Sequence, residues 1–156
     1  MQLLLDSELR IIRNGEEVSL YDKLGAQFRQ INGEHGVVFS VWAPNAKKVS
    51  VMGDFNGWDP KANPLSLQCE SGIWACFVSG VSQGALYKFF LLNSLGQTVE
   101  KTDPMGCFFE QAPKNSSIVW DTSHFDWTDQ NWMDARSVSN PLESPMSIYE
   151  IHLGSW

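Results

Sequence analysis

The chain has 156 residues, of which 43% are hydrophobic and 19% are charged, and its formal net charge at pH 7 is −7. These values predict a globular protein with one domain and connecting segments, or two very small domains, and they exclude a disordered chain. No run of Lys or Arg forms a basic surface and no apolar stretch is long enough to cross a bilayer, so we expect no nucleic-acid or membrane partner.

Residues 1–33 are expected to form a lead-in segment. Residues 7–15 are compatible with a strand followed by a turn, and residues 20–25 (LYDKLG) with a segment that packs along the domain that follows. The N-terminus lacks the basic start and long apolar stretch of a signal peptide. We therefore expect a cytoplasmic protein.

Residues 34–120 contain short stretches rich in β-branched and aromatic residues, separated by Gly, Pro and Asn. Residues 37–42 and 49–55 are joined by the turn-forming sequence APNA, which predicts a hairpin. Further strands are expected at residues 73–78, 85–92 and 117–120. Several short strands without a helical period predict an all-β fold, an immunoglobulin-like antiparallel sandwich over residues 34–120.

The sequence changes character after Trp120. Residues 121–145 are polar and contain two prolines, which predicts a linker. Residues 146–153 (MSIYEIHL) then read as a strand, and a lone strand requires a partner. The pattern therefore predicts that residues 146–156 begin a second, truncated domain.

Cysteine and histidine patterns give no sign of a metal centre or another cofactor. The cysteines are odd in number, without metal-ligand spacing, and predict small buried thiols in a reducing compartment: Cys69, Cys76 and Cys107. The histidines are scattered, with no spacing that suggests a metal site or a catalytic pair: His35, His124 and His152. We expect neither a metal nor a cofactor.

Five segments closely resemble bacterial glycogen branching enzymes of the α-amylase superfamily, glycoside hydrolase family 13. They are FSVWAPNAKKVSVMGDFNGWD (39–59), SGIWACFVSG (71–80), ALYKFFL (85–91), KTDP (101–104) and SIYEIHLGSW (147–156). The resemblance implies an isoamylase-type N-terminal carbohydrate-binding module (family 48) of the early-set immunoglobulin-like type. It also implies that residues 146–156 are the first strand of a catalytic (β/α)8 barrel.

These enzymes cleave α-1,4-glucan and transfer the released oligosaccharide to a 6-hydroxyl, which forms an α-1,6 branch. The family's catalytic carboxyl groups lie later in the barrel, and none of the matching motifs occurs here. We therefore expect no catalytic residue in this chain and no activity from it alone. The implied partners are α-1,4-glucan or glycogen and the missing barrel of the same enzyme, in a monomeric protein.

The resemblance also implies three glycan-binding residues. Trp58, at the end of GDFNGWD, stacks on α-glucan in related modules, with packing on a neighbouring domain as the alternative. Lys88, within YKFF, bonds sugar hydroxyls there, although it could equally be an edge-strand lysine that reaches solvent. Asn115 matches a polar contact, whereas residues 93–100 lack the second stacking aromatic of those modules.

Trp42 and Trp74 are expected in the core, because aromatic side chains commonly fill protein interiors. Two other functions are compatible with the same strand pattern: a stand-alone α-glucan-binding module, and an immunoglobulin-like interaction domain without glycan affinity. SIYEIHLGSW favours the branching enzyme over a stand-alone module, and the pair GDFNGW and YKFF disfavours the interaction domain.

Overall fold

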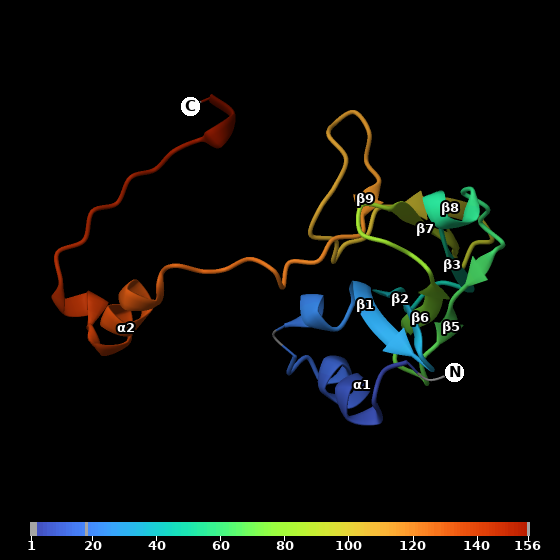
Figure 1. The fold of residues 1–156 in the computed structure, drawn as a ribbon, viewed down its shortest axis with the longest axis horizontal. Helices are drawn as coiled ribbons and strands as arrows, with labels where there is room; N and C mark the ends of the chain where they lie inside the picture. Colours follow the sequence, from blue (N-terminus) through green and yellow to red (C-terminus); the bar gives the residue numbers. More distant parts are fainter. Residues whose placement is uncertain (1–2, 18, 156) are drawn as a thin grey trace. The chain divides into compact units, whose positions relative to one another are not determined.

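The computed structural model describes residues 3–17 and 19–155 and divides the chain into two compact units, one ending at Thr122 and the other beginning at Ser123 (Figure 1). The elements of the first unit are α1 (Asp6–Arg13), η1 (Leu20–Asp22), β1 (Gly25–Ile31), β2 (Glu34–Trp42), β3 (Lys48–Gly53), η2 (Asp54–Asn56), β4 (Asn63–Pro64), β5 (Ser66–Leu67), β6 (Ile73–Ser79), β7 (Leu86–Leu92), β8 (Thr98–Lys101) and β9 (Ser117–Ile118). The second unit holds α2 (Gln130–Val138), η3 (Pro141–Glu143) and η4 (Leu153–Ser155).

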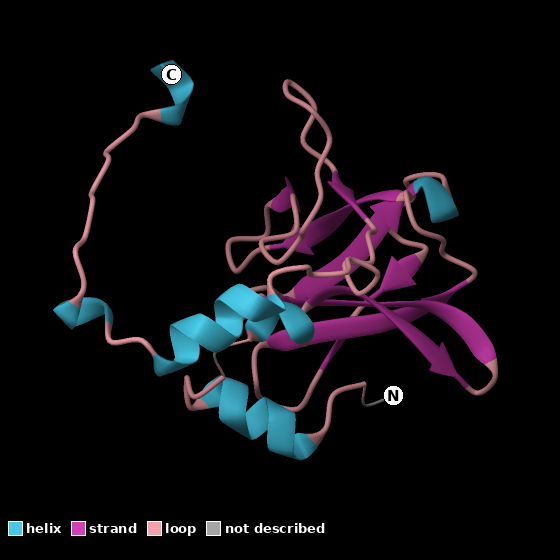
Figure 2. Ribbon diagram, turned by 60° about the vertical axis from the view of Figure 1, so that its left-hand side comes forward, coloured by secondary structure: helices cyan, strands magenta, loops and turns pink. Residues whose placement is uncertain are grey.

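The first unit is a sandwich of two antiparallel sheets (Figure 2). The first sheet has the order β1-β2-β6-β5, and the second has the order β4-β3-β7-β8, with β9 also paired to β7. The β-sandwich architecture expected from the sequence is therefore confirmed. β1 is a strand of the sandwich that the sequence reading did not assign.

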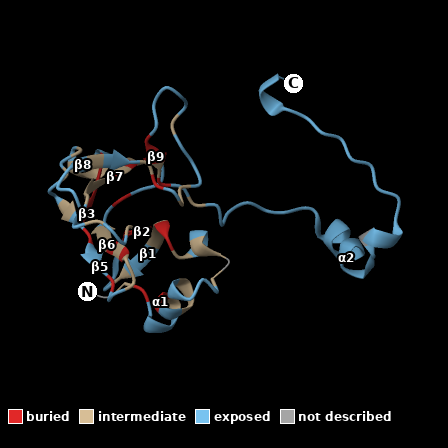
Figure 3. Ribbon diagram, turned by 180° about the vertical axis from the view of Figure 1, so that it is seen from behind, coloured by how far each residue is buried: buried red, intermediate tan, exposed pale blue. Residues whose placement is uncertain are grey.

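Alternating side chains from both sheets form the core between them, and the buried residues are coloured red on the ribbon in Figure 3. Phe39 of β2, Val51 of β3 and Phe89 of β7 are fully buried there. Successive side chains of a strand point to opposite faces, so the intervening residues of each strand lie on the outer surfaces of the sandwich. The residues on the outer face of the second sheet matter for the site described below.

The predicted hairpin between residues 37–42 and 49–55 is wrong. β2 pairs with β1 and β6 in the first sheet, whereas β3 pairs with β4 and β7 in the second. The partner of β2 is set by the two-residue turn Asn32-Gly33, both at positive φ (52° and 86°), which matches the twist of a hairpin. The APNA segment instead carries the chain from one sheet to the other.

The predicted strand at residues 7–15 is also wrong, because Asp6–Arg13 forms helix α1. Acidic residues occupy the first turn of α1 and Arg10 and Arg13 the last, which suits the helix dipole. Its Leu9 packs with Leu24 and with Ile73 of β6, so α1 covers part of the outer face of the first sheet.

The tryptophan and cysteine predictions are confirmed only in part. Trp74 packs against the sandwich core, and its Nε1 donates to the Ala43 carbonyl at 3.0 Å. Trp42, in contrast, is 61% exposed, because it ends β2 on the outer face of the sheet, where the α1 cluster buries Ile73 but not Trp42. Cys69 and Cys107 are exposed rather than buried.

The second unit contains helix α2 within the segment predicted to be a linker, and its described residues form no strand. Residues 146–152 have no regular secondary structure, so the predicted strand at 146–153 is not formed in this structure and stays a prediction. A strand forms by pairing its backbone groups with a neighbouring strand, and residues 146–152 belong to none of the strand pairs among the described residues. Trp156, the last residue of the motif SIYEIHLGSW, lies outside the described residues.

Candidate functional site

The segment GDFNGW connects β3 to the loop that carries Trp58, and its first residues fix that loop to the sandwich. A Cβ atom at Gly53 would lie 2.1 Å from the Leu86 carbonyl oxygen, so only glycine permits this close approach of β3 and β7. Phe55 stacks on the core residue Phe39, with 5.2 Å between the ring centroids. The loop is therefore anchored at its start by backbone and by an aromatic ring.

Asn56 holds the middle of the loop with three hydrogen bonds. Its Oδ1 accepts from the Gly53 amide at 2.9 Å, and its Nδ2 donates to the Val51 carbonyl at 3.1 Å and to Asn63 Oδ1 at 2.7 Å. Both N–H donors and the oxygen of one side chain thus hold the turn closed. Gly57 follows in the left-handed region, with φ of 62°.

Trp58 is half-buried and its indole is held by a carboxylate. The Trp58 amide donates to the Gly53 carbonyl at 2.9 Å, and the indole Nε1 donates to Asp54 Oδ1 at 3.0 Å. Asp54 Oδ2 accepts in turn from the Leu86 amide at 2.9 Å. Asp54 therefore connects the indole directly to the first residue of β7.

Lys88 lies on the outer face of β7, between the inward-pointing Tyr87 and Phe89. Its side chain is 18% exposed and its Nζ lies 3.8 Å from a carboxylate oxygen of Glu100 on β8. An ammonium group needs a partner or access to solvent, and Lys88 has both. A long ion pair of this kind leaves donor capacity for a ligand, since an ammonium group has three N–H bonds.

Asn115 is exposed and lies two residues before β9. Its carbonyl oxygen accepts a hydrogen bond from Thr102 Oγ1 at 2.6 Å, which fixes the backbone at this position. The Asn115 side chain makes no hydrogen bond with another described residue. Its amide is therefore available to a ligand at the surface.

Strand register brings the three segments together around one residue of β7. Tyr87 pairs with Gly53 of β3 on one side and with Ser117 of β9 on the other. The Trp58 loop and the Asn115 segment thus flank β7 beside Lys88. Among the described residues, no hydrogen bond or ion pair joins the three candidate side chains to one another.

Two positioning residues, Asp54 and Asn56, were missed in the sequence interpretation. Both are polar residues of the GDFNGW motif. Their roles depend on partners that the motif does not contain, since Asp54 bonds to Leu86 of β7 and Asn56 bonds to Asn63. A buried hydrogen-bond network also supports the site from inside. Tyr87 donates to Asp103 Oδ2 at 2.6 Å, and the Asp103 amide donates to Ser117 Oγ at 2.9 Å.

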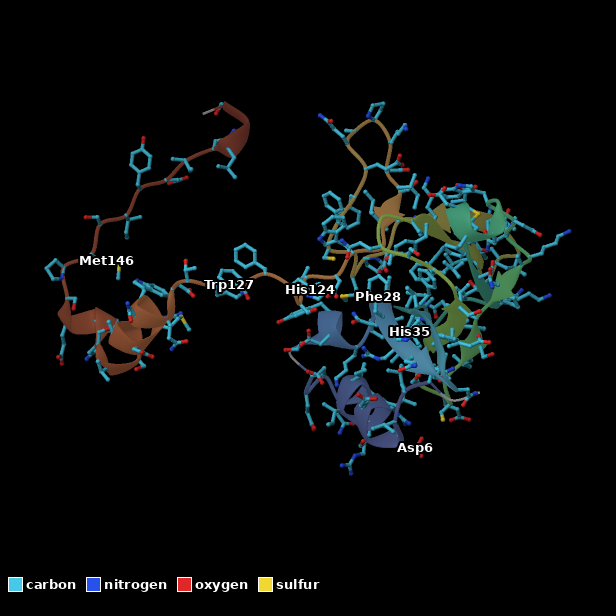
Figure 4. The ribbon with its side chains drawn as sticks, viewed as in Figure 1. Asp6, Phe28, His35, His124, Trp127 and Met146 are labelled. Carbon is cyan, nitrogen blue, oxygen red and sulfur yellow. The ribbon has the colours of Figure 1, made fainter. Side chains whose placement is uncertain are left out.

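His35, the histidine of the first unit, does not contribute to this site. His35 lies on β2 next to β1 in the first sheet (Figure 4), whereas the candidate site lies on the second. Within residues 3–17 and 19–155, no three His, Cys, Asp or Glu side chains gather in a way that could hold a metal ion. In the same ranges no helix has the length and apolar character that crossing a bilayer requires.

The fold and the site define a small antiparallel β-sandwich module that presents an ordered indole beside polar groups at one end of a sheet. Residues 23–106 match the family model of carbohydrate-binding module 48, the isoamylase N-terminal domain, and the chain belongs to this family.

Similar proteins include 1,4-alpha-glucan branching enzymes GlgB. That of Paramagnetospirillum magneticum is 45% identical over 97% of this chain and 20% of the relative, and one from a Synechococcus species is 47% identical over 94% and 19%. The chain thus spans about a fifth of the length of these relatives.

Solved structures of other proteins share the fold. The pullulanase PulA of Klebsiella pneumoniae is 26% identical with a TM-score of 0.51, over 63% of this chain and 9% of that protein. A putative alpha amylase of Salmonella typhimurium is 27% identical with a TM-score of 0.51, over 70% and 16%.

Proposed function

We propose that this chain is the N-terminal glycan-binding region of a 1,4-α-glucan branching enzyme, and that it binds α-1,4-glucan at Trp58. The observation that carries the proposal is the indole that Asp54 fixes to the first residue of β7, the strand that also carries Lys88, in a member of the carbohydrate-binding module 48 family. The identity of 45–47% to branching enzymes over nearly the whole chain supports the parent activity.

The proposed contacts follow from the chemistry of each side chain. A sugar ring has an apolar face that can stack on the indole, and polar edges that can bond to the Lys88 ammonium and the Asn115 amide. Because Asp54 already fixes the indole, less side-chain freedom is lost on binding. The module holds a glucan chain, and the branching reaction itself needs two carboxyl groups about 5 Å apart in the catalytic barrel.

The proposal assigns the C-terminal part of the chain a role other than glycan binding. We propose residues 121–145 as the connection to the barrel and residues 146–156 as its first strand, which pairs only when the rest of the barrel is present. The sandwich would be of the immunoglobulin-like early-set type, in a cytoplasmic, monomeric enzyme. The free cysteines support a reducing compartment.

Titration with maltoheptaose, followed by NMR chemical shifts, tests the glycan site. One aromatic platform is worth about 1–3 kcal/mol by analogy with stacking on bases, so we expect a Kd of about a millimolar. Trp58→Ala is expected to weaken binding at least about fivefold, and Lys88→Ala less.

The matched control is Trp127→Ala, which removes an indole that is 76% exposed in the second unit. It is expected to leave the affinity unchanged. If Trp58→Ala binds maltoheptaose as tightly as the parent, then Trp58 is a packing residue and the glycan site is elsewhere.

A further inference from the structure

The outer face of the second sheet has an apolar groove beside the candidate site. Phe90 and Leu92 follow Lys88 on this face of β7 at alternate positions, while Phe89 and Leu91 point inward. The groove has a volume of about 360 Å³. Its lining includes Phe90, Leu92, Pro60, Pro64, Lys48 and Lys61.

The groove and the Trp58 site are built from the same loop and the same strand. Pro60 follows Trp58 by two residues, and its carbonyl accepts from Ser50 Oγ at 2.6 Å, which fixes this part of the loop to β3. Phe90 follows Lys88 by two residues on the same face, a distance of about 7 Å along a strand. The loop therefore supplies residues to both the Trp58 site and the groove, and so does β7.

The length between the two places suits an oligosaccharide rather than a single sugar. Leu86, which Asp54 connects to the Trp58 indole, precedes Phe90 by four residues on β7. Four residues of an antiparallel strand span about 14 Å. A ligand in contact with both aromatic rings must extend over several sugar units.

The chemistry of the groove also suits a sugar. An aromatic ring and prolines give apolar surface for the face of a ring, whereas Lys48, Lys61 and Thr98 provide donors for hydroxyl groups at the edge. The volume lies near the lower end of the range for small-molecule sites, about 300–1,000 Å³. That is too small for a protein helix and large enough for part of a glucan chain.

We propose that this groove is a second glucan subsite, in which Phe90 stacks on a sugar of the same α-1,4-glucan that Trp58 binds. The proposal rests on the proposed function, since it extends the site at Trp58. Phe90 then determines the preference for longer chains.

The experiment compares Phe90→Leu with Phe90→Tyr by NMR titration of the full chain, using maltose and maltoheptaose. Leucine keeps an apolar side chain without a flat ring, and tyrosine keeps the ring. We expect Phe90→Leu to weaken maltoheptaose binding at least about fivefold, leave maltose binding unchanged and retain the parent's circular dichroism. Phe90→Tyr is expected to bind both ligands as the parent does.

The outcomes separate the two proposals. If Phe90→Leu binds maltoheptaose as tightly as the parent, or weakens both ligands equally, the second subsite is refuted while the Trp58 site stands. If the parent shifts the signals of the Trp58 loop with neither ligand, the proposed function fails and the subsite fails with it. Shifts of the Leu92 and Thr98 amides with maltoheptaose but not with maltose would support the subsite.

Discussion

Replacing Tyr87 by Phe is expected to destabilise the sandwich by an amount that depends on pH. The Tyr87 hydroxyl is buried and donates to Asp103 Oδ2 at 2.6 Å, while Asp103 Oδ1 accepts from the Met105 amide at 2.8 Å. The substitution removes one of the partners of a buried carboxyl group and keeps the ring. A hydrogen bond to a charged buried group contributes about 1.5–3 kcal/mol, so a loss of about 2 kcal/mol is expected at pH 7.

Asp103 sets how the stability loss of Tyr87→Phe changes between pH 4 and pH 7. Burial raises the pKa of this carboxyl group above its usual range, and the bond from Tyr87 opposes that rise. Without the hydroxyl, the pKa rises further in the folded state. A raised carboxyl pKa gives stability that is present below about pH 4 and is lost as pH rises, so Tyr87→Phe costs more at pH 7 than at pH 4.

Tyr87 itself sets how the stability difference between parent and variant changes above about pH 10. Burial, together with the nearby Asp103 charge, raises the pKa of Tyr87 well above its usual value. The parent therefore loses stability as pH rises above about 10, by about 1.4 kcal/mol for each pH unit, while the folded phenol keeps its proton. Phe cannot ionise, so the difference between parent and variant narrows again above pH 10.

Urea unfolding at pH 4, 7 and 10.5 measures these differences. At pH 7 the melting temperature should also fall by roughly 5–15 °C. Tyr21→Phe is the control, because this tyrosine is 63% exposed, and its variant should match the parent at every pH. A Tyr87→Phe penalty that is constant from pH 4 to 10.5, or no larger than that of Tyr21→Phe, would refute the account.

Two further predictions concern the loop and the thiols. Gly53→Ala should lower the free energy of unfolding by about 3 kcal/mol or more, because its Cβ would meet the Leu86 carbonyl at 2.1 Å. Gly57→Ala has open space around its Cβ and should lower it by only about 1–2 kcal/mol, because of its positive φ. Equal losses of stability in thermal unfolding would contradict this. With a disulfide reagent at pH 8, the exposed Cys69 and Cys107 should react first. Burial raises the pKa of the Cys76 thiol to about 12, so Cys76 should react only on unfolding. Mass spectrometry of the labelled peptides measures the order of reaction, and labelling of Cys76 as fast as Cys69 would contradict the prediction.

The parts of the fold that depend on local pattern could be predicted from the sequence. Stretches rich in β-branched and aromatic residues located β2, β3, β6 and β7. The Asn32-Gly33 pair was an available hairpin signal that the sequence interpretation did not use. With it, the false pairing of residues 37–42 with 49–55 would have been avoided.

Contacts between distant segments could not be predicted in the same way. Asp54 and Leu86 are 32 residues apart, so the bond that fixes the Trp58 indole depends on the pairing of β3 with β7. Trp42 has the composition of a core residue, but its position at the end of β2 on the outer face leaves it exposed. Burial of a tryptophan depends on what covers its face of the sheet, and no residue near it in the sequence determines that.

The backbone at Trp58 connects the loop's geometry to its proposed role. Trp58 has φ of 62°, directly after Gly57 with the same angle, and a bulky residue in the left-handed region costs about 1–2 kcal/mol. The hydrogen bonds from the Trp58 amide to Gly53 and from the indole to Asp54 offset that cost. A tryptophan that only packed would need neither the strained backbone nor a carboxylate on its indole nitrogen. The loop therefore holds the ring in one orientation before any ligand arrives, which is what a stacking platform requires.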